Sequence, residues 1–236
     1  MIRNNFSFAN MITPQLLNCT IDCNSPDRPQ RKRDEHDGES IAFWLAYPHG
    51  HYSGGIHSSS SNSSSSCGTG RQQRDQRNEQ EQEEELGVRI LLYDQGGGRG
   101  SLAEHLVEDT LNHLVTSHDS SQQGLSVAYL LATSGAGLQL LSSNGHRLLS
   151  MVQERTLNHV VGRSGGGGNA TASLHCGHSL AYWLAASELG IWLLTYNNSK
   201  LLHAISEHTL NSVIQTEGSS GGSVALALAR SEAGRL

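Results

Sequence analysis

Two glycine-rich pentapeptides hold the residues with the clearest potential for catalysis. The sequence Gly162-Arg163-Ser164-Gly165-Gly166 matches Gly-x-Ser-x-Gly, a pattern in which a sharp turn after a strand exposes a nucleophilic serine. Such a turn requires a helix directly afterwards, but the residues that follow, GGNATAS, form helices poorly. Residues 218–222 match the same pattern in a similar loop, so the match reflects the high glycine and serine content of these loops rather than a catalytic serine. We therefore predict that the chain is not an enzyme, and the alternative is a serine hydrolase that uses Ser164.

Histidine and cysteine are the next candidates, because both bind metal ions. Structural zinc sites pair their ligands at short, regular spacings. The chain has 13 histidines and four cysteines, and the closest groupings are His49, His51 and His57; His175, Cys176 and His178; and Cys19 with Cys23. No grouping supplies two ligand pairs. The glycine run at 96–100 also lacks the lysine of a phosphate-binding loop. We predict neither a metal site nor a cofactor.

Aromatic side chains on loops or element ends are candidates for binding another protein, since tyrosine and tryptophan dominate the binding energy of many interfaces. Aromatic residues make up only 5% of the chain. Tyr93, Trp192 and Tyr196 lie at the ends of apolar runs or in loops, and core packing is an equal possibility for Trp192. We take these three residues as the candidate protein-binding site.

Composition and charge exclude several classes of function. The formal net charge is −6, the opposite of what a general nucleic-acid binder needs to neutralise phosphates. No run of 18 apolar residues is present, so we expect no transmembrane helix. The first 20 residues lack the apolar stretch and cleavage site of a signal peptide, and the cysteines are irregularly spaced. These features predict a cytoplasmic protein.

The apolar residues are concentrated in part of the chain, which predicts its domain organisation. Residues 1–39 are predicted to be a disordered N-terminal segment, and residues 48–85, rich first in serine and then in glutamine and glutamate, a low-complexity insertion. Residues 40–47 are predicted to be a strand, and residues 86–236 to hold the repeated structural units.

An internal repeat decides the fold prediction. Four apolar segments share one pattern: 42–46, 128–132, 181–185 and 225–229. A second block aligns without gaps at 102–115, 148–161 and 201–214, with a shared glutamate followed by Thr-Leu-Asn. The repeated glutamates (Glu108, Glu154, Glu207) could line a pocket, but repetition favours a structural role for this block, with threonine and asparagine bonding backbone at turns. Each unit contains four runs of strand length, with a period typical of propeller blades.

The stretch from Tyr182 to Ile214 resembles a blade of the divergent WD-repeat-like β-propellers found near the C-termini of Roco-type kinases, JNK-interacting scaffolds and Rho exchange factors. The resemblance covers about residues 86–236. It implies an all-β fold, a partial propeller of about three to four four-stranded blades whose last blade is incomplete; the alternative is a helical repeat. The expected function is a non-catalytic scaffold, a fragment or component of a larger signalling protein, that binds other proteins and self-associates through its incomplete blades.

Overall fold

The fold is helical in every part of the chain that the structure describes. The computed structural model describes residues 9–20, 39–47, 86–93, 100–116, 122–162, 177–213 and 222–231. No strand occurs within these ranges, where β pairing is limited to single bridges such as Thr20–Ser40 and Val160–Ser179. The predicted all-β propeller is therefore wrong, and so is the resemblance to WD-repeat blades. The alternative, a helical repeat, is the reading that agrees with the structure.

The four segments predicted as strands are the clearest correction. They are the helices α3 (Ile41–Ala46), α6 (Val127–Ala132), α11 (Leu180–Ala185) and α14 (Val224–Arg230), so the strand predicted at 40–47 is also wrong. Each helix starts after a serine whose side chain accepts a hydrogen bond from the backbone N–H three residues later, at 3.1 to 3.2 Å. A serine cap of this kind satisfies one of the free N–H groups of the first turn.

The helices form four units of the same design. A short first helix opens each unit: α2 (Pro14–Asn18), α5 (Glu108–Asn112), α9 (Glu154–Asn158) and α13 (Glu207–Asn211). The second helix is α3, α6, α11 or α14. A third helix follows in units 1 to 3: residues 86–92, α7 (Gly135–Ser142) and α12 (Glu188–His203). The connections contain η4 (Leu102–His105), η5 (Asn144–His146) and α8 (Arg147–Ser150).

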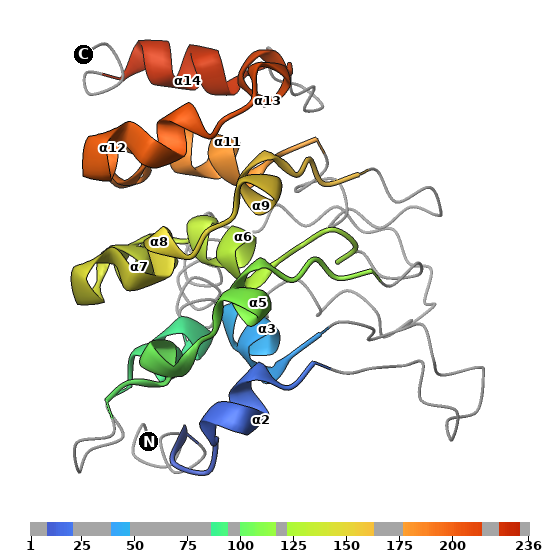
Figure 1. Ribbon diagram of the computed structural model, residues 1–236, viewed down its shortest axis with the longest axis vertical. Helices are drawn as coiled ribbons and strands as arrows, with labels where there is room; N and C mark the ends of the chain where they lie inside the picture. Colours follow the sequence, from blue (N-terminus) through green and yellow to red (C-terminus); the bar gives the residue numbers. More distant parts are fainter. Residues whose placement is uncertain are drawn as a thin grey trace, which may run out of the picture.

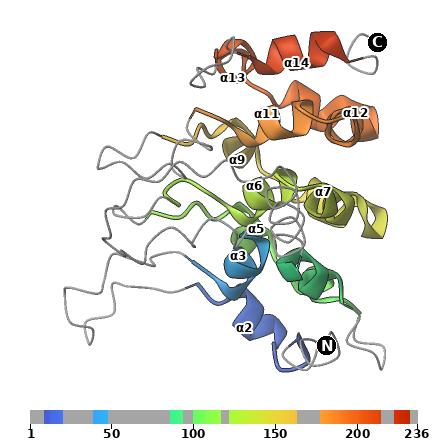
Figure 2. The same cartoon turned by 180° about the vertical axis from the view of Figure 1, so that it is seen from behind.

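The units stack in chain order. Figure 1 shows α2 at one end of the stack and α13 with α14 at the other, and the view from behind in Figure 2 shows the same order. The second helices contact one another along the stack, α3 with α6, α6 with α11 and α11 with α14, and α7 contacts α12. An array in which each unit contacts only its neighbours is the defining property of a solenoid.

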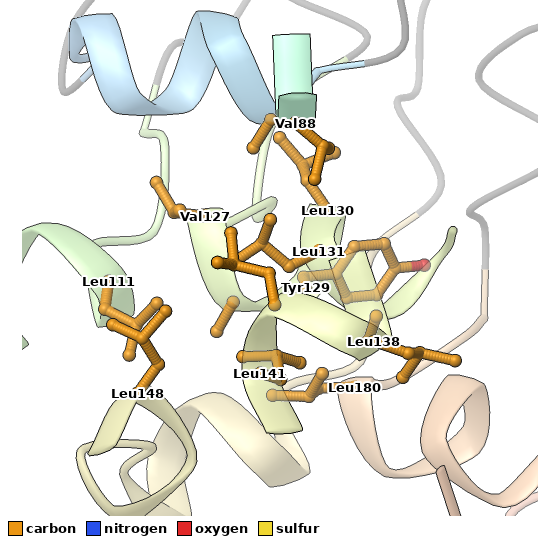
Figure 3. Close-up of a cluster of buried hydrophobic side chains, with 14 of the residues drawn as sticks. Val88, Leu111, Val127, Tyr129, Leu130, Leu131, Leu138, Leu141, Leu148 and Leu180 are labelled. Atoms are coloured by element: carbon orange, nitrogen blue, oxygen red, sulfur yellow. The ribbon is translucent and has the colours of Figure 1, made fainter. Parts of the chain in front are cut away.

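The apolar side chains of successive units meet in one continuous core. Figure 3 shows Leu111 and Leu148 beside the α6 residues Leu130 and Leu131, with Leu180 of the next unit below them. All of these leucines are buried. Short helices are unstable alone, so the stability of each unit depends on this shared burial.

The asparagine that ends the first helix links each unit to the next. The Asn112 side chain donates to the carbonyl of Glu108 in its own helix at 2.9 Å and to that of Met151 in the following connection at 2.7 Å. Its oxygen accepts from the Gln153 N–H at 2.8 Å. Asn18 repeats this pattern with His105 and Val107, and Asn158 with Ala204 and Ser206. We call these three residues the asparagine ladder.

The threonine of the same block points in the other direction along the stack. The hydroxyls of Thr110, Thr156 and Thr209 lie 3.4 Å from the backbone carbonyls of Asn18, Asn112 and Asn158 in the preceding units. The prediction that threonine and asparagine bond local backbone holds for the asparagine bonds to Glu108, Glu154 and Glu207, whereas the threonine hydroxyls and the other asparagine bonds reach a neighbouring unit. The repeated glutamates start the short first helices, where a negative charge is favoured.

Backbone hydrogen bonds join the two ends of the connection between the first and second helices in units 2 and 3. The Val115 N–H donates to the Leu125 carbonyl at 2.9 Å, and one unit later the Val161 N–H donates to the His178 carbonyl at 3.0 Å. Gly124 and Gly177 donate back to the carbonyls of Val115 and Val161. The same pair of backbone hydrogen bonds therefore closes this connection in both units.

Burial at His159 predicts a pH dependence of stability. His159 is half-buried, and desolvation lowers its pKa below the ordinary value. The unfolded chain, with a pKa of about 6.5 at this residue, then binds more protons than the folded chain below that pH. Above about pH 6.5, His159 is neutral in both the folded and the unfolded chain and does not reduce the free energy of unfolding. We expect the free energy of unfolding to fall as the pH decreases below about 6.5. Urea unfolding at neutral and mildly acidic pH measures this, and a His159→Asn variant that keeps the whole decrease contradicts the assignment.

Candidate functional site

The third helix of unit 3 carries two large aromatic side chains on its outer surface. Trp192 is 46% exposed and Tyr196 is 39% exposed, whereas their neighbours Leu193 and Leu194 are buried. Residues four apart lie on the same face of a helix, so the two rings are adjacent. Their centroids are 5.5 Å apart, with an angle of 42° between the planes.

A histidine from the preceding unit completes this group. The His146 ring is stacked on that of Tyr196, with centroids 3.8 Å apart and planes at 26°, and its centroid lies 5.1 Å from that of Trp192. Neither ring nitrogen of His146 has a hydrogen-bond partner, and both are shielded from solvent. We call His146, Trp192 and Tyr196 the aromatic cluster. It joins η5, the turn that follows the third helix of unit 2, to the third helix of unit 3.

Local backbone geometry positions the three rings. Asn144, Gly145 and His146 all have positive φ, with 64° at His146, which turns the chain sharply after α7. The equivalent turn in unit 3 is formed by Asn197, Asn198 and Ser199, with φ from 53° to 60°, directly after Tyr196. Left-handed conformations are uncommon for residues with a Cβ and are most often adopted by asparagine. The two turns place His146 and Tyr196 at the same end of adjacent helices.

The aromatic cluster is not part of the repeated framework. Aligning the third helices at Gly87, Gly137 and Gly190 places Arg89 and Gln139 at the position of Trp192, and Tyr93 and Ser143 at that of Tyr196. A residue that the stack requires recurs in each unit, as the asparagine ladder does, but Trp192 has no aromatic counterpart in units 1 and 2, and Tyr196 has one only in unit 1, at the partly buried Tyr93. The exposure of Trp192 therefore has no structural reason that the other units share, and an exposed aromatic surface is a feature of binding sites.

An acidic residue lies on the same helix face. Glu188 is exposed in the first turn of α12, four residues before Trp192 and eight before Tyr196. Positions spaced by four residues form one stripe along a helix. An aromatic face attracts a cation, and a nearby carboxylate adds electrostatic attraction. This stripe has the chemistry to hold an arginine or lysine side chain.

Of the three predicted site residues, the structure brings together two. Tyr93 lies in unit 1, at the end of helix 86–92, where it is partly buried and packs against the core. Sequence reasoning did not identify His146, because only the stacking of units 2 and 3 brings it to Tyr196. Its one sequence signal is the Asn-Gly-His turn that follows the apolar run of α7.

The residues considered for chemistry lie mostly outside the described ranges. Ser164, Ser220, His49, His175 and Cys176 are among them. His178 is described, and its ring is 4.7 Å from that of Tyr182 and 5.3 Å from that of Trp183. Among the described residues, no group of three or more histidine, cysteine, aspartate or glutamate side chains is placed to hold a metal ion.

Comparisons of the chain with protein-family models, with curated proteins and with solved structures found no match. In the parts of the chain that the structure describes, every helix is too short or too polar to cross a lipid bilayer.

Proposed function

We propose that this chain is a binding protein whose partner is a segment of another protein that places an arginine or lysine side chain against Trp192 and Tyr196. The observation that carries the proposal is the aromatic cluster, in which the exposed rings of Trp192 and Tyr196 lie beside His146 of the preceding unit and Trp192 has no aromatic counterpart in units 1 and 2. The earlier interpretation as a propeller scaffold is wrong, because the described residues form helices. The present proposal depends only on the helical stack.

Three features support a basic partner. Indole and phenol faces attract guanidinium and ammonium groups, with a gain of about 0.5 to 2 kcal/mol for each contact. Glu188 adds a carboxylate on the same helix face. The chain as a whole carries a net charge of −6, which steers a basic segment toward it and repels an acidic one. The rigid stack holds these groups in place before binding, which lowers the entropic cost.

We expect Trp192→Ala to weaken binding by at least tenfold, because truncating an aromatic anchor costs about 2 kcal/mol or more. The probe is a random peptide library displayed on phage and selected against the full chain. The affinities of selected peptides are then measured by fluorescence anisotropy for the wild type and the variant. Selected peptides should be enriched in arginine or lysine. A Glu188→Gln variant should bind them about threefold more weakly, with the loss decreasing at high salt.

Gln139→Ala is the matched control, because Gln139 occupies the position of Trp192 in unit 2 and is exposed. This variant should bind like the wild type. Peptides that bind equally well after Trp192→Ala, a selection that yields only apolar or acidic peptides, or a selection that yields no binder contradict the proposal. Thermal unfolding of each variant separates loss of binding from loss of the fold.

The absence of catalysis and a cytoplasmic location belong to the same proposal. The irregular cysteine spacing is typical of a reducing compartment. The hydrolase alternative depends on Ser164, which lies outside the described ranges, and no observation favours it.

A further inference from the structure

The two ends of the stack differ from the ends of a capped solenoid. Terminal repeats usually present a polar outer surface, which keeps a stacked protein soluble and monomeric. Here Met11 is 72% exposed and Leu16 is 47% exposed at the end formed by α2. At the other end, Val213 is 64% exposed and Leu226 of α14 is 37% exposed. Both ends therefore present apolar side chains.

The exposed residues of the last unit occupy positions that are covered in earlier units. Val213 aligns with Val160 and Leu114, which are both partly buried. Leu226 aligns with Phe43 and Tyr129, which are almost fully buried, and with Tyr182, which is partly buried. The Tyr129 hydroxyl accepts a hydrogen bond from the Trp183 ring N–H of the following unit at 2.6 Å. The face formed by α13 and α14 therefore has the same apolar positions that units 1 and 2 use to receive a neighbour.

The asparagine ladder is also open at this end. Asn211 aligns with Asn112 and Asn158, and its side chain donates to the Glu207 carbonyl of its own helix at 3.1 Å. The two bonds that Asn112 makes to the following unit, with the Met151 carbonyl and the Gln153 N–H, have no counterpart at Asn211 within the described residues. Asn211 is exposed, with its amide oxygen and one N–H free for a further partner.

The first unit presents the complementary backbone groups. Alignment of α2 with α9 places Met11 at the position of Met151 and Thr13 at that of Gln153. Thr13 caps α2 with its side chain, but its backbone N–H makes no hydrogen bond within the described residues, and neither does the Met11 carbonyl. The end of the stack at α2 therefore offers one acceptor and one donor, in the order that the ladder uses.

We propose that the chain binds a second copy of itself head to tail, with Asn211 of one copy bonding the Met11 carbonyl and the Thr13 N–H of the next. The apolar contact places Val213 and Leu226 against Met11 and Leu16. Because the two faces differ, the contact is heterologous, and repeated addition extends the stack rather than closing a symmetric dimer. This association requires no part of the aromatic cluster, which lies on the outer side of units 2 and 3.

The first test is the mass of the full chain as a function of concentration, measured by sedimentation velocity. We expect dimers and longer species to increase with concentration. Asn211→Ala should raise the dissociation constant roughly tenfold, since it removes two intermolecular hydrogen bonds of about 0.5 to 1.5 kcal/mol each. Met11→Arg and Val213→Arg should each abolish association, and both positions are too exposed for these changes to unfold the chain.

A mixture of the two arginine variants tests the polarity of the contact. The Met11→Arg copy keeps an intact α13–α14 face, and the Val213→Arg copy keeps an intact α2 face, so the mixture should form a 1:1 dimer and nothing larger. Gln139→Arg adds the same charge in the middle of the stack and should associate like the wild type. A monomeric wild type at all concentrations, self-association of either arginine variant alone, or a mixture that stays monomeric overturns the proposal.

Discussion

Gly137→Ala is expected to lower the free energy of unfolding by about 3 kcal/mol or more, an effect beyond the usual range for one methyl group. A Cβ at Gly137 would overlap the backbone carbonyl of Leu131, at the crossing of α6 and α7. Backbone cannot rotate away as a side chain can, so the two helices would have to separate. Because Leu131, Leu138 and Leu141 are all buried at this crossing, separation exposes part of the core. Urea unfolding followed by far-UV circular dichroism measures the loss.

Gly135→Ala is the control for this prediction. Gly135 lies two residues earlier in the same helix, and a Cβ there meets no atom within 4 Å. Alanine is the better helix former by about 1 kcal/mol, so this variant should be as stable as the wild type or more so. Gly190→Ala should reproduce the large loss, because its Cβ would overlap the Leu184 carbonyl in unit 3. Equal stability of the Gly135 and Gly137 variants would show that the α6–α7 crossing adjusts freely.

Asn112→Ala is expected to cost about 3 kcal/mol in the free energy of unfolding. The side chain is only 1% exposed, and its removal leaves the Met151 carbonyl and the Gln153 N–H without their partner at the contact between units 2 and 3. A backbone group left unpaired in a buried position costs about 1 to 3 kcal/mol. Asn112→Asp should also be destabilised, since it keeps the acceptor but loses both N–H donors.

Asn211→Ala supplies the comparison, because Asn211 occupies the same position in unit 4 and bonds only its own helix. Its effect on the unfolding of the monomer should lie within about 0.5 kcal/mol, as for most exposed positions. Measurement at low protein concentration keeps self-association from contributing to the result. If Asn112→Ala and Asn211→Ala lower the free energy of unfolding equally, the stabilising bond is the one within the first helix and not the bonds of Asn112 to the next unit.

The sequence predicted the register of the repeat but not its secondary structure. The four aligned segments are the four second helices, and the aligned Glu, Thr and Asn positions make equivalent bonds in successive units. The strand assignment was wrong because runs of five to eight residues do not distinguish a strand from a buried helix. Length misled here, since a helix in a stack is stabilised by its neighbours and can be shorter than a helix that forms alone.

Two signals in the sequence favoured helices. A serine precedes each apolar run, at Ser40, Ser126, Ser179 and Ser223, and serine is a preferred residue at a helix start. Each run also has alanine at two positions four residues apart, such as Ala181 and Ala185, the spacing of one helix face. Alanine is the strongest helix former and is depleted in strands.

The candidate site was predictable in part. The residue types of Trp192 and Tyr196 and their place at the ends of apolar runs predict a binding role, and the structure shows both side chains exposed and adjacent. The stacking of His146 on Tyr196 depends on the distance between units, which no local pattern encodes. Tyr93 met the same sequence criteria, but the packing of helix 86–92 against the core leaves it partly buried.

The backbone hydrogen bonds that close the connection between the first and second helices make the positions of these helices independent of the length of the connection. Nine residues lie between Val115 and Leu125 in unit 2, and sixteen between Val161 and His178 in unit 3, yet the same pair of backbone bonds closes both. Closing the longer loop costs only about 0.5 kcal/mol more in chain entropy. Insertions and deletions at these positions are therefore expected to be nearly neutral for folding, so that a connection can change in length while the helices keep their spacing.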